Sequence, residues 1–173
     1  MRKMTGYLFL CVGFLLLDGC SARQKTVTNL PPGVTQGQAQ SWDTAVANLD
    51  KIANSTSTLR QAVIALNTAT VTDAQGTHKV IPDGATYAAI LTSIGKIDQA
   101  EQDAVQYLRA QPQNWGISTQ ARIKNDVALI QAELSNITQQ QLTGIKNSAA
   151  QQQVQGLIST IGNSALLILS LIG

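Results

Sequence analysis

The chain has very few of the residues that build metal centres and most catalytic sites. Its 173 residues include two cysteines, one histidine and only 4% aromatic residues. A disulfide framework is therefore excluded, and the chain has too few cysteine and histidine ligands for a typical zinc site. A di-iron or di-manganese site in a helical bundle also needs two Glu-x-x-His motifs, whereas His78 is the only histidine. We expect no metal and no cofactor.

Charge is scarce as well. Charged residues make up 13% of the chain, and 12 basic residues nearly balance 10 acidic ones. This balance gives no field strong enough to attract nucleic acid or to steer a charged substrate. Serine and threonine are abundant, but no nucleophile elbow, phosphate-binding glycine loop or dinucleotide motif surrounds them. We therefore expect a protein that is not an enzyme, with no nucleic-acid partner and no evident small-molecule substrate.

The N-terminus has the pattern of a targeting segment. Arg2 and Lys3 precede an uninterrupted apolar run from Tyr7 to Leu17. The run has about the length of a signal-peptide core and is too short for a typical membrane span. Residues 1–19 are therefore predicted to be a signal peptide.

The run ends in Leu17-Asp18-Gly19-Cys20, which resembles the lipobox of bacterial lipoproteins. The resemblance implies that Cys20 receives a diacylglyceryl group, becomes the first residue after cleavage, and is acylated at its new N-terminus. Asp18 departs from the pattern, which usually has a small neutral or aliphatic residue there. The alternative is an ordinary Cys20 thiol that follows an uncleaved N-terminal anchor.

The residues after Cys20 favour lipidation. Residues 20–37 are small and polar around Pro31-Pro32-Gly33, which is typical of a flexible tether. In Gram-negative hosts, Ser21 resembles the sorting signal for the outer membrane. The expected location is the cell envelope, with the lipid in the outer membrane and the chain facing the periplasm if the host is Gram-negative.

Residues 38–173 are predicted to form one all-α domain. Apolar residues recur at helical spacing in four segments of similar length, at about Gln38–Asn67, Asp83–Ala110, Ile117–Leu142 and Ile145–Ile172. In the first segment a heptad pattern predicts that one face is buried and that the other faces, which include Asn48, meet solvent. The two core positions of the pattern hold Trp42, Leu49, Thr56 and Val63, and Ala45, Ile52, Leu59 and Leu66. Asp83 is a candidate N-cap, and Pro112 marks the end of the second segment. Equal lengths favour an up-and-down four-helix bundle. Only Gly144 separates the last two segments, so a continuous helix from Ile117 onward is the alternative.

The first connection is predicted to contain a small β-hairpin at about residues 70–81. Two threonine- and valine-containing runs flank Asp73-Ala74-Gln75-Gly76, a turn signal with glycine at its fourth position. A two-stranded hairpin is marginal alone, so we expect it to pack across one end of the bundle through Val71, Val80 or Ile81. His78 is expected to be an exposed strand residue.

Glu101 has two interpretations. It follows Tyr87 and Ile94 at seven-residue steps, which would place it at the seam between helices beside a partner such as Arg122 or Lys124. Asp98 lies three residues before it and shares its face, where the carboxylates could bind a cation or pair with the third helix. A solvated helix border is the interpretation we favour.

The C-terminal turns are apolar on every side. A helix that is hydrophobic all round must be covered all round, by the fold, by another subunit or by a bilayer that it enters without crossing. The candidate contact residues are Leu157, Ile161, Leu166, Leu169 and Ile172. The sequence thus predicts a non-enzymatic envelope lipoprotein that binds a protein partner or self-associates. The alternative is a membrane-active accessory protein whose C-terminal helix contacts the bilayer.

Overall fold

The computed structural model describes residues 30–74 and 76–172, and most of them are helical. The elements in chain order are α1 (Gln36–Thr68), β1 (Thr70–Asp73), β2 (Gly76–Lys79), α2 (Gly84–Ala110), α3 (Ile117–Asn136), a π-helical turn η1 (Ile137–Gln141), a 3₁₀ turn η2 (Leu142–Gly144) and α4 (Ser148–Leu169). The four predicted helices and the hairpin are confirmed.

Polar side chains fix where α1 and α2 begin. At α1, the Thr35 hydroxyl accepts the backbone N–H of Gln38 (3.2 Å), and the Gln38 side chain accepts the N–H of Thr35 (2.9 Å). At α2, the Asp83 carboxylate accepts the N–H groups of Ala85 (3.0 Å) and Thr86 (3.1 Å), which confirms the predicted cap. These bonds satisfy backbone donors that have no partner inside the helix.

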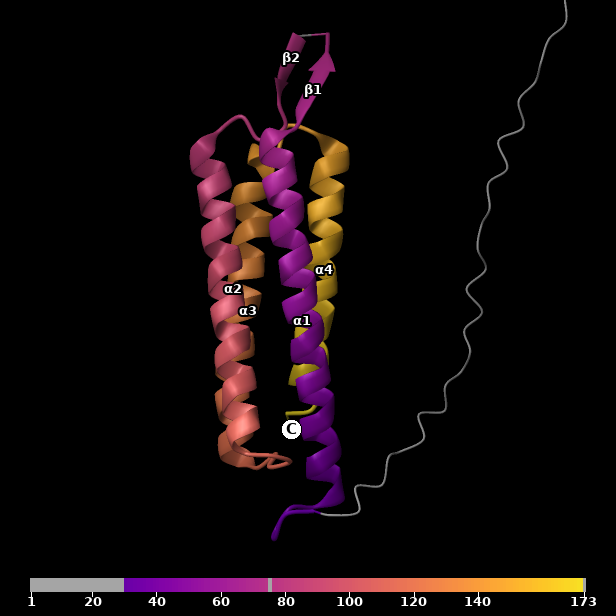
Figure 1. The fold of residues 1–173 in the computed structure, drawn as a ribbon, viewed down its shortest axis with the longest axis vertical. Helices are drawn as coiled ribbons and strands as arrows, with labels where there is room; N and C mark the ends of the chain where they lie inside the picture. Colours follow the sequence, from indigo (N-terminus) through magenta and orange to yellow (C-terminus); the bar gives the residue numbers. More distant parts are fainter. Residues whose placement is uncertain (1–29, 75, 173) are drawn as a thin grey trace, which may run out of the picture.

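The four helices lie side by side (Figure 1). α1 packs mainly against α4 and α2, and α2 packs against α3, whereas α3 packs only lightly against α4. The C-terminus lies toward the end of the molecule where α1 begins, far from the hairpin (Figure 1).

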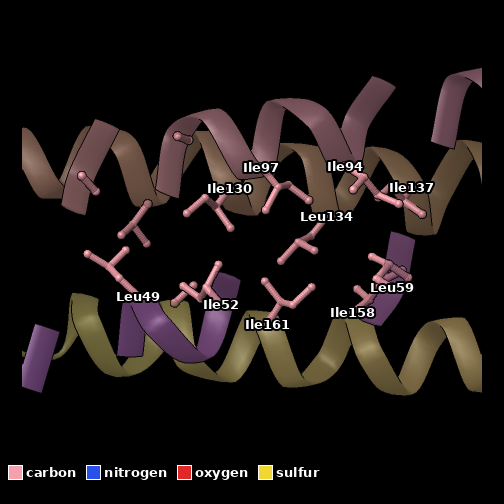
Figure 2. Packing of buried hydrophobic residues seen from close by; sticks show 14 of the residues in the cluster. Leu49, Ile52, Leu59, Ile94, Ile97, Ile130, Leu134, Ile137, Ile158 and Ile161 are labelled. Atoms are coloured by element: carbon pink, nitrogen blue, oxygen red, sulfur yellow. The ribbon is translucent and has the colours of Figure 1, made fainter. Parts of the chain in front are cut away.

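Aliphatic side chains from all four helices fill one continuous core. Figure 2 shows them pointing toward one another, with Leu49, Ile52 and Leu59 from α1, Ile94 and Ile97 from α2, Ile130 and Leu134 from α3, and Ile158 and Ile161 from α4. The predicted heptad positions of α1 are buried, except that Trp42 and Leu66 are partly exposed. Asn48, predicted to face solvent, is buried as well.

The hairpin does not lie across the end of the helices as predicted. Its two antiparallel strands project beyond them (Figure 1), and the side chains of Thr70, Thr72, Thr77 and Lys79 are exposed. Val80 and Ile81, which follow β2, do enter the core, while Val71 is partly buried against it. The hairpin is therefore held at its base. At its tip, Gly76 has φ +113°, a conformation that favours glycine.

The chain turns at Gly144, and the alternative of one continuous helix from Ile117 is wrong for this structure. α3 ends at Asn136, and the backbone continues through η1 and η2 before α4 begins at Ser148. The Asn147 side chain caps α4 by accepting the N–H of Ala150 (2.9 Å). α4 is therefore three residues shorter at each end than the predicted segment.

Candidate interaction surfaces

The two residues of the predicted lipidation signal lie outside the described residues. Cys20 and Ser21 belong to residues 1–29, so their roles stay predictions. The described chain starts at Leu30, and α1 follows six residues later. The surfaces considered below belong to the folded part alone.

The structure divides the candidate C-terminal contact residues between core and surface. Ile161 is fully buried among the helices, so it is not available to a partner while they remain packed. Leu157, Leu169 and Ile172 are partly buried against the core. Leu166 is 56% exposed, and its neighbour Leu167, which the sequence did not single out, is 52% exposed. The accessible apolar surface of α4 therefore centres on these two leucines.

The last residues are tied back to the fold by a tryptophan. The indole N–H of Trp115 donates to the carbonyl of Leu171 (3.0 Å), and Trp115 is only 3% exposed. Trp42 makes a similar bond to the carbonyl of Leu108 (3.1 Å), which joins α1 to the end of α2. Both bonds give a largely covered indole the partner that its donor requires. The fold itself thus covers much of the apolar C-terminus.

An open groove runs between α4 and the helical stretch formed by α3 and η1, where α3 packs only lightly against α4. Its volume is about 360 Å³, and its floor is apolar, with Leu134 and Ile158. Its walls are mostly uncharged polar side chains, namely Gln131, Ser135, Thr138, Gln139, Ser159 and Asn163. Leu166 lines the same groove, so the groove and this exposed leucine form one continuous region.

The hairpin offers a different kind of surface. The Val80 N–H donates to the Ala69 carbonyl (3.0 Å), and β1 pairs with β2 in the register Val71 with His78 and Thr72 with Thr77. Because bonded pairs alternate along an antiparallel ladder, the backbone groups of Thr72 and Thr77 point outward. Their hydroxyls contact each other at 2.8 Å. Within the described chain, both strands are therefore edges with unpaired backbone groups.

Glu101 is buried, so the preferred interpretation as a solvated helix border is wrong. It is 7% exposed, and the structure gives its carboxylate no hydrogen bond and no ion pair among the described residues. Burial raises its pKa, and the nearby charges of Asp50 and Asp98 raise it further, while Arg109 opposes them.

Two of the charged residues expected beside Glu101 have other partners. Arg122 pairs with Asp126 (3.1 Å). Asp98 pairs with Arg60 and thereby joins α2 to α1.

A polar cluster that the sequence did not reveal links α2 to the end of α3. The buried Ser93 hydroxyl accepts from the side-chain amides of Asn136 and Gln141 (3.2 Å each). Nearby, Glu133 pairs with Lys96 (2.8 Å). Burial raises the pKa of Glu133, but hydrogen bonds from Lys96, Ser93 and Asn136 outweigh it and leave that pKa below its usual value. The cluster fixes the π-helical turn against α2.

Metal-ligating residues do not converge in the part of the chain that the structure describes. No group of three or more histidines, cysteines, aspartates or glutamates is placed to hold a metal ion there. Two neighbouring acidic residues of α2 are each bound to a different side chain. Asp98 forms an ion pair with Arg60, and Asp103 accepts a hydrogen bond from the Gln99 side chain (2.8 Å). His78, expected to be exposed, is half-buried on β2.

Among residues 30–74 and 76–172, no helix combines the length and hydropathy needed to cross a membrane. No family model, no curated protein and no solved structure matches the chain.

Proposed function

We propose that this chain is a non-enzymatic envelope lipoprotein, anchored through Cys20, whose helical domain binds a protein partner or a second copy of itself. The observation that carries the proposal is Leu17-Asp18-Gly19-Cys20 at the end of an eleven-residue apolar run, followed by a polar tether. If the host is Gram-negative, Ser21 directs the protein to the outer membrane, where the domain faces the periplasm.

We infer that the domain is an up-and-down four-helix bundle with the hairpin in its first connection. The contacts of α1 with α2 and α4, and of α3 with α2, support this arrangement. The tether then joins the end where α1 begins, and the hairpin lies at the opposite end. α1 contains 33 residues, so the hairpin begins about 50 Å from the tether at 1.5 Å per residue.

The surfaces assigned to a partner are the groove between α3 and α4, with Leu166 at its side, and the hairpin. The groove walls are uncharged, which suits contact with another polar protein surface through amide and hydroxyl hydrogen bonds. The test is recovery of the lipidated protein from native membranes after cross-linking. A cross-linked species of defined mass that Leu166→Gln or Thr72→Pro removes supports the assignment, and cross-linking unaffected by either contradicts it.

The exposure of Leu166 and Leu167 favours the second candidate, a membrane-active accessory protein. In this case the C-terminal helix rests its exposed leucines on a bilayer. Flotation with liposomes separates the two functions when the chain begins at Ser21 and therefore carries no lipid. A membrane-active protein floats with the vesicles, whereas a protein-binding domain stays at the bottom of the gradient.

A further inference from the structure

The end of the fold at which α1 begins is uncharged. Three segments form it, namely residues 30–42 at the start of α1, residues 110–121 between α2 and α3, and residues 157–172 in the second half of α4 and beyond. None of them contains an aspartate, glutamate, lysine, arginine or histidine. The charged residues that border these segments along the chain are Asp43, Arg109 and Arg122.

Two tryptophan hydrogen bonds join the three segments. The Trp115 indole donates to the Leu171 carbonyl (3.0 Å), so the α2–α3 connection lies against the residues that follow α4. The Trp42 indole donates to the Leu108 carbonyl (3.1 Å), so the start of α1 lies against the end of α2. The C-terminus lies toward this same end (Figure 1). Both tryptophans of the chain therefore lie at the uncharged end.

Exposed aliphatic side chains stand on this end. Ile117 is the first residue of α3 and, at 87% exposed, the most exposed large apolar residue of the described chain. The loop before it is held in place, because the Gly116 N–H donates to the Asn114 side chain (3.0 Å). Leu167, in the last turn of α4, is more than half exposed. Two apolar side chains are thus presented to the surroundings on a surface without charge.

The length of chain that precedes the described fold limits how far this end can lie from a lipid on Cys20. Ten residue steps join Cys20 to Leu30, and they span at most about 35 Å when fully extended. α1 begins at Gln36, close behind Leu30. The hairpin begins about 50 Å farther away, at the other end of α1. An anchor at Cys20 therefore holds the uncharged end, and not the hairpin, near the bilayer.

The chemistry of this end suits the interface of a bilayer. A charged side chain loses its hydration when it enters a membrane, whereas an aliphatic side chain leaves water favourably. Interfacial segments sink only about 5–10 Å, so side chains at the ends of helices can reach the acyl boundary. The hairpin end differs, because it carries Lys79, Asp83 and Lys146.

We propose that the anchored domain docks on its own membrane through the uncharged end, with Ile117 and Leu167 in the interface and the hairpin directed away from the bilayer. This orientation rests on the lipid anchor of the proposed function and deepens it, because it fixes which way the domain faces. Neither residue lines the groove between α3 and α4, and the hairpin lies at the opposite end. The docked residues and the partner surfaces are therefore different ones.

Docking needs the anchor. A single myristoyl chain binds a bilayer only marginally, and two aliphatic side chains bury less apolar surface than such a chain. The anchor makes the contact intramolecular and so raises the effective concentration of the end at the bilayer. This dependence separates docking from the membrane-active candidate, which binds a bilayer without lipid.

The test uses the two tryptophans as reporters. A chain that begins at Cys20 keeps every described residue and contains one cysteine, so a synthetic thiol-reactive lipid attaches to Cys20 alone. The lipid-coupled chain is bound to phosphatidylcholine vesicles with or without bromine on the acyl chains, which quenches indole fluorescence at short range. Brominated vesicles should quench this chain and leave Cys20→Ser, which carries no lipid, unquenched. Equal fluorescence of the coupled chain in both vesicles overturns docking. Equal quenching of Cys20→Ser overturns the need for the anchor.

Two double variants locate the contact. Ile117→Ser with Leu167→Gln removes two exposed aliphatic side chains from the uncharged end and should lower the ratio of docked to free domains at least about tenfold. Ile64→Ser with Leu129→Gln removes two exposed aliphatic side chains elsewhere and should leave this ratio unchanged. All four side chains are exposed, so both variants should keep the urea midpoint of the wild type. Equal losses in the two variants, or no loss in the first, overturn the assignment.

Salt separates apolar docking from attraction to lipid phosphates. In about 1 M salt the screening length is about 3 Å, so attraction through Arg109 or Arg122 is largely lost. Quenching that persists in this salt supports docking by the uncharged end, and quenching that salt abolishes overturns it.

Chemical coupling of the lipid keeps this test independent of lipoprotein processing in the host. Native protein without lipid refutes the anchor of the proposed function. A lipid-coupled chain that brominated vesicles do not quench refutes the docking surface instead, so the two failures are distinguishable.

Discussion

Gly144 and Thr86 leave no space for another carbon atom between them. A Cβ on Gly144 would lie 2.4 Å from Cγ2 and 2.7 Å from Oγ1 of Thr86. Thr86 is itself held in place, because its hydroxyl donates to the carboxylate of Asp83 (3.0 Å), the residue that caps α2. The α3–α4 connection and the first turn of α2 therefore fix each other's position.

We expect Gly144→Ala to lower the free energy of unfolding by about 1–3 kcal/mol, the usual cost of overpacking. Urea denaturation measures the change. Gly156→Ala is the control, because its added methyl group meets open space and improves helix propensity. Its stability should stay equal or rise by up to about 1 kcal/mol. Equal losses in both variants contradict this account.

Glu101→Gln should stabilise the protein at neutral pH. The pKa of Glu101 is raised in the folded chain, so its ionised form favours the unfolded chain. Its contribution to stability is fully present below the usual value of 4.5 and is lost as the pH rises through the raised pKa. The glutamine has no charge to desolvate, and we expect a gain of about 1 kcal/mol at pH 7.

The pH dependence separates this effect from a general gain in packing. Urea denaturation of wild type and Glu101→Gln at several pH values should show curves that converge below pH 4.5 and separate as the pH rises. Asp50→Asn is a useful comparison, because it removes a neighbouring charge that raises the same pKa and should give a smaller gain. A constant difference at all pH values would show that ionisation of Glu101 is not the cause.

Trp115→Phe should loosen the C-terminus without unfolding the helices. The substitution keeps an aromatic ring but removes the donor to the Leu171 carbonyl, at a cost of about 1 kcal/mol. Hydrogen exchange should increase in the last turn of α4 and remain unchanged at the start of α1. Ile117→Ser, at an 87% exposed position near Trp115, should leave both regions unchanged.

Leu166→Gln combined with Leu167→Gln should change function more than stability. Both side chains are more than half exposed, so each substitution should alter the free energy of unfolding by less than about 0.5 kcal/mol. If the exposed leucines meet a partner or a bilayer, the double variant loses cross-linking or vesicle flotation while its urea midpoint is unchanged. The matched control is Leu129→Gln, which is 59% exposed and lines a separate groove between α2 and α3.

Local rules were sufficient to predict the helices and the hairpin. The apolar periodicity, the Asp83 cap, Pro112 and the single breaker at Gly144 placed the helix ends within three residues of those observed, with one exception. The third helix was predicted to reach Leu142, whereas α3 ends at Asn136 and continues as the π-helical turn η1. These signals lie within short segments, because caps and turns depend on neighbouring residues. The burial of α1 followed in the same way from its heptad pattern.

Features that depend on contacts between distant segments could not be predicted. Glu101 is buried within the packed helices, near Asp50 of α1, and Arg122 is paired with Asp126 on its own helix. The hairpin projects because only its base residues Val80 and Ile81 enter the core. The apolar C-terminus was predicted to be covered by the fold, a second subunit or a bilayer, and the fold supplies part of this cover, because α4 packs on α1 and Trp115 bonds to Leu171. Each outcome depends on which helices become neighbours.

The central claim is that Cys20 anchors a folded domain to the envelope by lipid. The most direct test is the intact mass of the protein extracted from membranes of its native host, compared with that of a Cys20→Ala variant. We predict a mass that fits a chain beginning at Cys20 with acyl groups attached, and the variant should lose these groups. A mass that still contains residues 1–19 and no lipid would contradict the claim and make the N-terminus an uncleaved anchor.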